Sequence, residues 1–115
     1  MDEDCLFCKI VRKEIPATIV VDNDDVVAFR DLNPMAPTHV LVIPKQHIVG
    51  ADAIAADHGA VLAAMFVAAK DIAAADGVDE SGYRTVFNVG RDSGQSVPHL
   101  HLHVLGGRQM KWPPG

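Results

Sequence analysis

One stretch near the C-terminus, His99-Leu-His-Leu-His-Val-Leu105, places three of the chain's six histidines at a spacing of two residues. Side chains two positions apart in a β-strand lie on the same face of the sheet. The pattern therefore predicts a strand with His99, His101 and His103 in a row on one face and the intervening apolar side chains turned to the core. Three imidazoles in register favour a functional site over a polar strand face that carries histidine by chance.

From the residues alone, this row has two functional uses, metal ligation and nucleophilic or acid–base catalysis. A metal site made only of these three side chains is geometrically awkward, because alternating side chains run in a line whereas zinc takes ligands at tetrahedral corners. Two of the three could still bind a metal with help from elsewhere. The Cys-x-x-Cys formed by Cys5 and Cys8 indicates metal or redox chemistry rather than a structural disulfide in a cytoplasmic chain.

Length and charge limit the possibilities further. A chain of 115 residues is long enough for a single domain, which we expect to span residues 1–115. The net charge of −5 argues against a partner that is a nucleic-acid polymer, while a small anionic ligand remains allowed. No apolar run is expected to be long enough to cross a bilayer, and the acidic start Met1–Asp4 lacks the basic region of a signal peptide. These features predict a cytoplasmic protein without a membrane partner.

Hydrophobic periodicity and turn residues predict the elements in chain order. They are a short amphipathic helix over 6–14, strands over 18–21 and 26–30, a proline-containing loop over 31–37, a buried strand over 38–43, a long alanine-rich helix between Gly50 and Gly77 with Asp57 as candidate N-cap, and strands over 83–88 and 99–105. This order predicts an α+β fold with a five-stranded, mainly antiparallel sheet, one long helix and one short helix.

With these residues in view, the chain resembles the histidine triad (HIT) superfamily, whose His-φ-His-φ-His-φ-φ signature is matched by residues 99–105. It looks most like the Hint branch, the purine nucleoside phosphoramidases. The resemblance covers essentially the whole chain and is carried by residues 7–16, 37–45, 94–97 and 106–115. It implies the HIT fold and a homodimer whose two sheets join into one, with the tail 106–115 and its Trp112 reaching the partner's active site.

The resemblance also implies the reaction, cleavage of the P–N bond of adenosine or guanosine 5′-phosphoramidates through a nucleotidyl-histidine intermediate. By position the nucleophile is His101, held by a hydrogen bond to the backbone carbonyl of His99. An imidazole with a pKa near ~6.5 is largely neutral and nucleophilic at cytoplasmic pH, which agrees with this role. His103 is expected to donate to a phosphate oxygen, His39 to complete the catalytic group and Ser96 to help the leaving amine.

For the purine nucleotide, the resemblance implies that Asp31 binds the ribose hydroxyls. The remaining nucleotide-binding residues it implies are Phe7, Ile10, Phe29, Leu32 and Ile43 around the base, and Asn88, Gly94, Gln95, Ser96, His101, His103 and Trp112 around the phosphate and leaving group. No cofactor is expected for catalysis. A structural zinc ion is expected on Cys5, Cys8, His47 and His99, with reduced, unliganded thiols as the alternative.

Some features leave alternatives open. Pro98 has no N–H, so any hydrogen bond that the family donates from this position is lost. Arg30 and Arg91 add positive charge near the expected pocket. Three other functions remain: another HIT nucleotide hydrolase or nucleotidyl transferase, such as a dinucleoside polyphosphate hydrolase; a non-catalytic nucleotide-binding module; and a zinc enzyme that uses the triad directly.

Overall fold

A five-stranded sheet forms the centre of the structure, a computed structural model that describes residues 3–115. Its strands are β1 (Ile19–Asp22), β2 (Val26–Arg30), β3 (Thr38–Pro44), β4 (Tyr83–Phe87) and β5 (Leu102–Gly106). They lie in the order β1-β2-β3-β5-β4, and each neighbouring pair is antiparallel. The predicted α+β fold with a five-stranded antiparallel sheet is therefore confirmed. Met1 and Asp2, which belong to the predicted domain and acidic N-terminal segment, lie outside the described residues.

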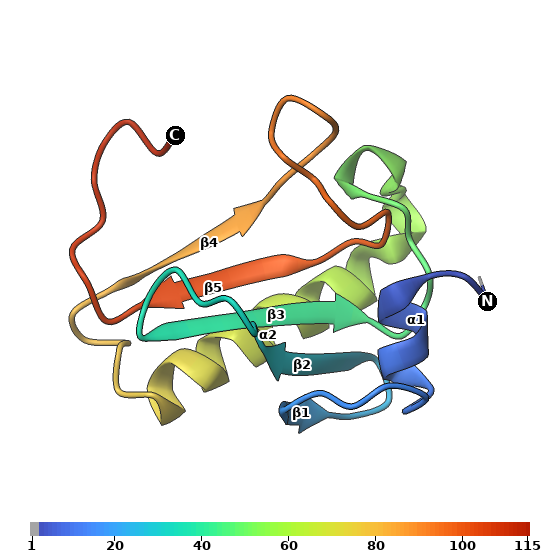
Figure 1. Ribbon diagram of the computed structural model, residues 1–115, viewed down its shortest axis with the longest axis horizontal. Coiled ribbons are helices and arrows are strands. Elements are labelled where there is room, and N and C mark those ends of the chain that lie inside the picture. Colours follow the sequence, from blue (N-terminus) through green and yellow to red (C-terminus); the bar gives the residue numbers. More distant parts are fainter. Residues whose placement is uncertain (1–2) are drawn as a thin grey trace.

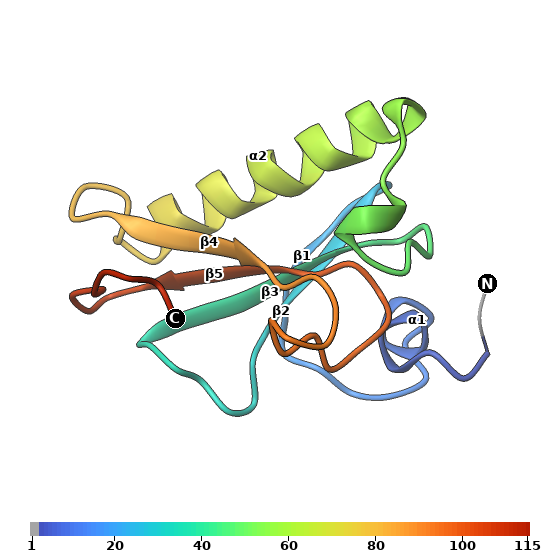
Figure 2. The same ribbon diagram turned by 90° about the horizontal axis from the view of Figure 1, so that it is seen from above.

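The helices lie on opposite sides of the sheet. The long helix α2 (Gly59–Ala75) crosses one face, and the short helix α1 (Leu6–Val11) lies against one end of the other face (Figure 1). Figure 2 shows that the loop over 31–37 and the loop over 88–98 project on the same side of the sheet as α1. Two short 3-10 turns, η1 (Ala51–Ala53) and η2 (Ala56–His58), lead into α2. Two large loops, 31–37 and 88–98, are thus on the α1 side.

Alternation along the strands divides the buried side chains into two cores. Toward α2 pack Val40, Val42, Leu102 and Val104. Toward α1 pack the alternate strand residues Val27, Phe29, Leu41 and Ile43. Strand β3 is buried along its whole length, as its nearly continuous apolar sequence predicts. The period of two also holds for the histidine stretch, because Leu100 joins the α2-side core. The three histidines are thereby left on the side of the sheet that carries α1.

Helix α1 is shorter than the residues 6–14 predicted for it. It ends at Val11, and Lys13 takes a left-handed conformation with φ 61°. The backbone N–H of Lys13 donates to the Ile10 carbonyl and that of Glu14 to the Lys9 carbonyl, at 3.0 and 2.9 Å. This is a Schellman ending, which satisfies the last carbonyls before the chain reaches Pro16. The prediction missed it because the residue in the left-handed position is lysine rather than glycine.

Two other boundaries differ from the predictions. Asp57 does not cap α2, because it lies within η2 and the helix begins after His58. The last strand begins at Leu102 rather than at His99. Val42 lies opposite Leu102, so the same register would place Ile43 opposite His101 and then Pro44, which has no N–H to donate, opposite Leu100. Residues 99–101 therefore leave the ladder, and the Leu100 N–H donates instead to the Ile48 carbonyl at 2.6 Å.

The segment Ala56–Ala75 has the length and mean hydropathy, 1.4, of a membrane-crossing helix by composition alone. The expectation that no apolar run is this long was therefore wrong. In the structure one face of this helix packs on the sheet through Met65, Ala68, Ala69, Ile72 and Ala73. A core helix with an alanine-rich outer face passes the same test, so the absence of a membrane partner stays a prediction.

One ion-pair network ties the end of α2 to the sheet and gives a stability prediction. The Arg30 guanidinium donates to both Asp76 carboxylate oxygens at 2.8 and 2.9 Å, and the Thr38 hydroxyl donates to one of them at 2.9 Å. Arg30 and, to a smaller extent, Thr38 hold the pKa of the Asp76 carboxyl below its ordinary value. A depressed folded-state pKa contributes stability above the unfolded pKa, and this stability is lost as the pH falls through the folded pKa.

We expect Asp76→Asn to lower the free energy of unfolding by about 1 kcal/mol at neutral pH, since the charge is lost while an acceptor for Thr38 remains. The difference from wild type should shrink as the pH falls below ~3.9, where the unfolded carboxyl is protonated. Urea unfolding of both proteins across this range measures it. A difference that stays constant with pH would contradict the assignment of the effect to the carboxylate charge.

Candidate active site

His101 lies at the centre of the α1-side face, and its orientation is fixed by its own backbone neighbourhood. The ring is buried, and its Nδ1 lies 2.7 Å from the carbonyl oxygen of His99. A carbonyl only accepts, so Nδ1 carries the proton and, in the neutral ring, Nε2 keeps its lone pair. The edge of Phe7 packs against the imidazole with ring centroids 5.1 Å apart. The arrangement presents one unprotonated nitrogen that can act as a nucleophile or base.

A second pair of histidines is linked across strands β3 and β5. The Met35 N–H donates to His39 Nδ1 at 3.0 Å, so the proton of a neutral His39 is on Nε2. That Nε2 lies 2.9 Å from His103 Nδ1 and donates to it, which places the His103 proton on Nε2. Among the described residues, His103 Nε2 is the buried side-chain polar atom with no hydrogen-bond partner. This series of hydrogen bonds thus ends at the His103 Nε2–H, a donor without an acceptor among the described residues.

Electrostatics keep this pair neutral. Burial lowers the pKa of His103 to about 4, with the neighbouring His101 and His39 acting in the same direction. Burial also lowers the pKa of His39, and the carboxylate of Asp31, 3.5 Å from His39 Nε2, opposes the shift. Asp31, His39 and His103 are close enough together to be considered as a metal site. A hydrogen bond already joins His39 Nε2 to His103 Nδ1, so these two nitrogens bind each other rather than a common metal ion.

Two cysteines and two histidines converge next to this centre. The ligand atoms of Cys5, Cys8, His47 and His99 all lie within 4.8 Å of one another. Cys5 Sγ is 3.3 Å and His47 Nδ1 is 3.1 Å from His99 Nδ1, and Cys8 Sγ is 3.2 Å from His47 Nδ1. Helix α1 supplies Cys8 and, at its N-cap, Cys5.

The donor set fits a structural zinc ion. His99 Nε2 lies 2.9 Å from the Pro44 carbonyl and donates to it, so the lone pair of Nδ1 faces the two thiols. Burial lowers the pKa of His99 to about 4, which keeps this lone pair available. Two thiolates and two imidazoles are a closed tetrahedral set for zinc, with no open position for substrate. The predicted metal ligands are therefore brought together, with His99 linking this cluster to His101.

The predicted base-binding residues line an apolar pocket of about 290 Å³ next to α1. Phe7, Ile10, Phe29, Asp31 and Leu32 belong to its wall. Ile43 does not, because it is fully buried and lies behind the pocket in the α1-side core. The wall also includes Leu6, Ile15, Pro16, Ala17 and Leu41, which the sequence reasoning passed over. The apolar run at 15–17 was the available signal, but it was interpreted only as the end of the helix.

The loop over 89–97 is held by one side chain. The Gln95 amide nitrogen donates to the carbonyls of Val49 and Val97 at 3.0 and 3.1 Å, and its oxygen accepts from the Gly90 N–H at 3.0 Å. Gly94 has φ 86°, a conformation that favours glycine. The predicted phosphate donors near Gly94 are engaged, because the N–H groups of Gly94 and Gln95 donate to Arg91 and Gly90. The roles of Gly94, Gln95 and the exposed Ser96 toward a phosphate stay predictions.

The other predicted residues lie apart from the apolar pocket. Asn88 and Trp112 line a separate hollow of about 610 Å³ along β4, and Trp112 is 82% exposed. By contrast, Arg30 lines the apolar pocket, near which it was expected, and its guanidinium is paired with Asp76. Arg91 is exposed and pairs with its neighbour Asp92. The structure thus assembles the histidines, the metal ligands and most of the base pocket. Asn88 and Trp112 line a separate hollow, although alternation along β4, with Val86 opposite His103, puts Asn88 on the histidine side of the sheet.

Comparison with known proteins gives concordant matches. The HIT domain family matches residues 12–110. A purine nucleoside phosphoramidase of Escherichia coli is 46% identical over 110 residues, which cover 96% of this chain and 92% of that protein. A 14 kDa zinc-binding protein of Zea mays is 47% identical over 116 residues, covering 99% and 90%. The crystal structure of a HIT family hydrolase from Legionella pneumophila superposes with a TM-score of 0.96 at 54% identity, covering 97% of this chain and all of that one.

Proposed function

This chain belongs to the HIT domain family, and from that premise we propose that it hydrolyses the P–N bond of purine nucleoside 5′-phosphoramidates. The observation that carries the proposal is the pair of fixed tautomers, which turns a lone pair on His101 Nε2 and an unpartnered N–H on His103 Nε2 to the α1 side of the sheet. This reaction requires a nucleophile for the phosphorus and a hydrogen-bond donor for the phosphoryl oxygen, and the two histidines supply both. The name and the identity of the Escherichia coli relative support the choice of substrate class.

The proposed reaction has two steps. His101 Nε2 attacks the α-phosphorus, a P–Nε2 bond forms and the P–N bond to the amine breaks. The Ser96 hydroxyl gives its proton to the departing amine and takes one from solvent water. The His101 ring becomes positively charged, and the His99 carbonyl, already 2.7 Å from Nδ1, stabilises that charge. Water then attacks the phosphorus, the P–Nε2 bond breaks with its electron pair returning to Nε2, and one proton of the water passes to solvent, which leaves the nucleoside monophosphate and neutral His101.

His103 acts on the phosphoryl group in both steps. Its Nε2–H donates to a non-bridging oxygen on which negative charge grows in the transition state. Because burial lowers the pKa of His103 to about 4, it stays a neutral donor at neutral pH and does not compete with His101 for protons. No cofactor takes part. A zinc ion on the Cys5, Cys8, His47 and His99 set would be structural, holding the residue whose carbonyl orients His101.

Steady-state hydrolysis of adenosine 5′-phosphoramidate tests the proposal, with diadenosine polyphosphate as the competing P–O–P substrate. Turnover of the P–N substrate with a higher kcat/KM supports it. Preference for the P–O–P substrate would assign the chain to the other nucleotide hydrolases of the family. Binding of AMP with no turnover of either substrate would assign it to the non-catalytic nucleotide-binding proteins.

Asp31 is proposed to bind the ribose hydroxyls, from the wall of the apolar pocket. We expect Asp31→Asn to lower kcat/KM for the ribonucleotide substrate about tenfold, the cost of weakening hydrogen bonds to a charged acceptor. Asparagine keeps an oxygen for the Asn33 N–H, which Asp31 accepts at 2.9 Å, so the loop is preserved. The measurement compares adenosine 5′-phosphoramidate with its 2′-deoxy analogue. If wild type and variant discriminate equally between the two, Asp31 does not bind the ribose.

We also propose that two chains pair along their β4 strands in the cytoplasm as a homodimer. β4 is at the edge of the sheet, where its outer backbone groups are open to another strand. Phe66 and Val67 on the outer face of α2 are 47% and 53% exposed, and Phe66 packs against Phe87 of β4. Trp112 is exposed in the single chain and would be covered by the partner. Sedimentation velocity measures this; a monomer at micromolar concentration would contradict it.

A further inference from the structure

The tail that follows β5 is seated tightly on the loop over 31–37. Gly107 has φ 92°, and a Cβ added there would lie 2.9 Å from Pro37 Cβ, so only glycine fits this close approach. The next residue, Arg108, donates from Nε to the Met35 carbonyl at 2.8 Å. The tail is therefore joined to the loop both by close packing and by a hydrogen bond from a charged group.

Met35 is also the residue whose N–H fixes the tautomer of His39. Three hydrogen bonds follow one another here. Arg108 Nε donates to the Met35 carbonyl at 2.8 Å, the Met35 N–H donates to His39 Nδ1 at 3.0 Å, and His39 Nε2 donates to His103 Nδ1 at 2.9 Å. The series ends at His103 Nε2, the buried N–H that has no partner in the described part of the chain. Arg108 is thus the outer end of a connected set of contacts whose inner end is the N–H proposed to bind the phosphoryl group.

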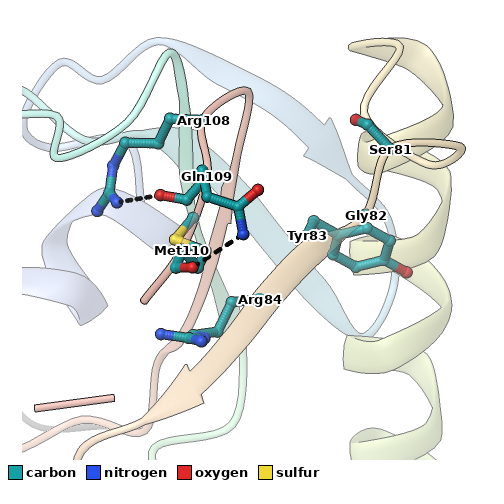
Figure 3. A pocket seen from close by; sticks show the side chains of 7 residues that line it. All are labelled: Ser81, Gly82, Tyr83, Arg84, Arg108, Gln109 and Met110. Carbon is teal, nitrogen blue, oxygen red and sulfur yellow. Dashed lines mark hydrogen bonds between the residues drawn. The ribbon is translucent and has the colours of Figure 1, made fainter. Parts of the chain in front are cut away.

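The Arg108 guanidinium is not committed elsewhere to a carboxylate within residues 3–115. Its second hydrogen bond is to the Gln109 carbonyl at 3.3 Å. Arg108 lines a further pocket, formed by residues 81–84 and 108–110, and Figure 3 shows its side chain reaching away from Ser81, Gly82 and Tyr83 on the far side of that pocket. Hydrogen bonds from a charged donor are stronger and shorter than neutral ones. The group is therefore suited to hold one carbonyl of a loop that has two prolines and no regular structure.

We propose that Arg108 is a positioning residue for His103. By holding Met35 it keeps the Met35 N–H on His39 Nδ1, which keeps the His39 proton on Nε2 and the His103 proton on the nitrogen that faces substrate. Without Arg108, the loop would sample positions in which His39 is free to take its other tautomer. The consequence for turnover rests on the proposed function, whereas the consequence for the tautomers does not.

Three variants test this in the full-length protein. Arg108→Gln removes the charged donor, and Arg108→Lys keeps a charge with a single donor. Arg84→Gln is the matched control, because Arg84 lines the same pocket and donates to another tail carbonyl, that of Lys111 at 3.1 Å, but contacts neither Met35 nor His39. The readouts are the ¹⁵N resonances of the His39 and His103 rings, then kcat and KM for adenosine 5′-phosphoramidate.

In wild type and in Arg84→Gln we expect the His39 ring to show a single tautomer with Nε2 protonated. In Arg108→Gln we expect averaged His39 resonances and a kcat lower by about tenfold with KM changed by less than about twofold, since the lost interaction acts in the transition state. Arg108→Lys should recover part of both. If Arg108→Gln keeps the wild-type tautomer, or Arg84→Gln loses it equally, the proposal is wrong.

The two proposals fail in different ways. If the wild type does not hydrolyse the phosphoramidate, the proposed function is lost, but the ring resonances still decide whether Arg108 sets the tautomers. If Arg108→Gln is unfolded by circular dichroism, the comparison is made between wild type and Arg108→Lys. A lysine variant that is folded, with the wild-type kcat and resonances, would then overturn a role that depends on the guanidinium.

Discussion

His101→Ala should abolish phosphoramidate hydrolysis, with a fall in kcat/KM of about 10⁴-fold or more, because no other group can form the covalent intermediate. Nucleotide binding should survive, since the apolar pocket and Asp31 are left in place. Intact-mass measurement after rapid quench should show a nucleotidyl adduct on the wild type and none on the variant. The same protein samples give the affinity for AMP by titration calorimetry.

The matched control for this experiment is His58→Ala. His58 lies before α2, where its Nδ1 accepts from the Ala55 N–H at 2.9 Å, and it belongs to no part of the candidate site. It controls for the loss of one imidazole, and we expect its kcat/KM to stay within about twofold of wild type. Residual activity above about a tenth of wild type in His101→Ala would contradict the role of His101 as nucleophile.

Removal of the metal should have the second largest effect, on stability. The purified protein should contain one zinc ion per chain by metal analysis. Zinc at a thousand times its Kd stabilises the folded state by about 4 kcal/mol, so chelation should lower Tm by roughly 15 °C for a chain of this size. We expect a smaller loss of kcat as well, because His99 would no longer be held by the ion while its carbonyl orients His101.

The variant Cys8→Ser distinguishes the loss of stability caused by metal removal from other effects of the chelator on the protein. Its Tm should be low from the start and should not change when chelator is added, because one of the four ligands is gone. A wild-type protein that contains no zinc and keeps its Tm in chelator would establish reduced, unliganded thiols instead. Turnover that stops in chelator before any unfolding would point to the third alternative, a zinc enzyme that uses the triad directly.

Much of this site could be predicted from sequence where a pattern had a fixed geometric meaning. The period of two in residues 99–105 placed the three histidines on one face, although the hydrogen-bonded strand begins only at Leu102. The Cys-x-x-Cys at the start of α1 was informative because a single turn of helix brings the two thiols to one side. Strand β3 was evident from its short apolar run closed by Pro44, which is typical of a strand covered on both faces.

What could not be predicted depends on backbone groups in irregular segments. The Met35 N–H that fixes His39 belongs to a loop with two prolines, and no periodicity gives its direction. The same holds for the Gly94 and Gln95 N–H groups, whose partners are carbonyls of their own loop. The pairing of Arg30 with Asp76 could not be predicted either, because it joins the end of β2 to the end of α2 across 46 residues of sequence.

The Gln95 side chain, which bonds Val49, Val97 and Gly90 together, has a consequence for how this site can be changed. Gly50 permits the contact, because a Cβ there would lie 3.1 Å from the Gln95 amide nitrogen. The segment 49–50 and the loop 90–97, about forty-five residues apart in sequence, therefore depend on each other's conformation. The loop that bears Ser96 cannot be grafted or randomised alone to accept new leaving groups, and libraries must vary residues 49–50 and 90–97 together.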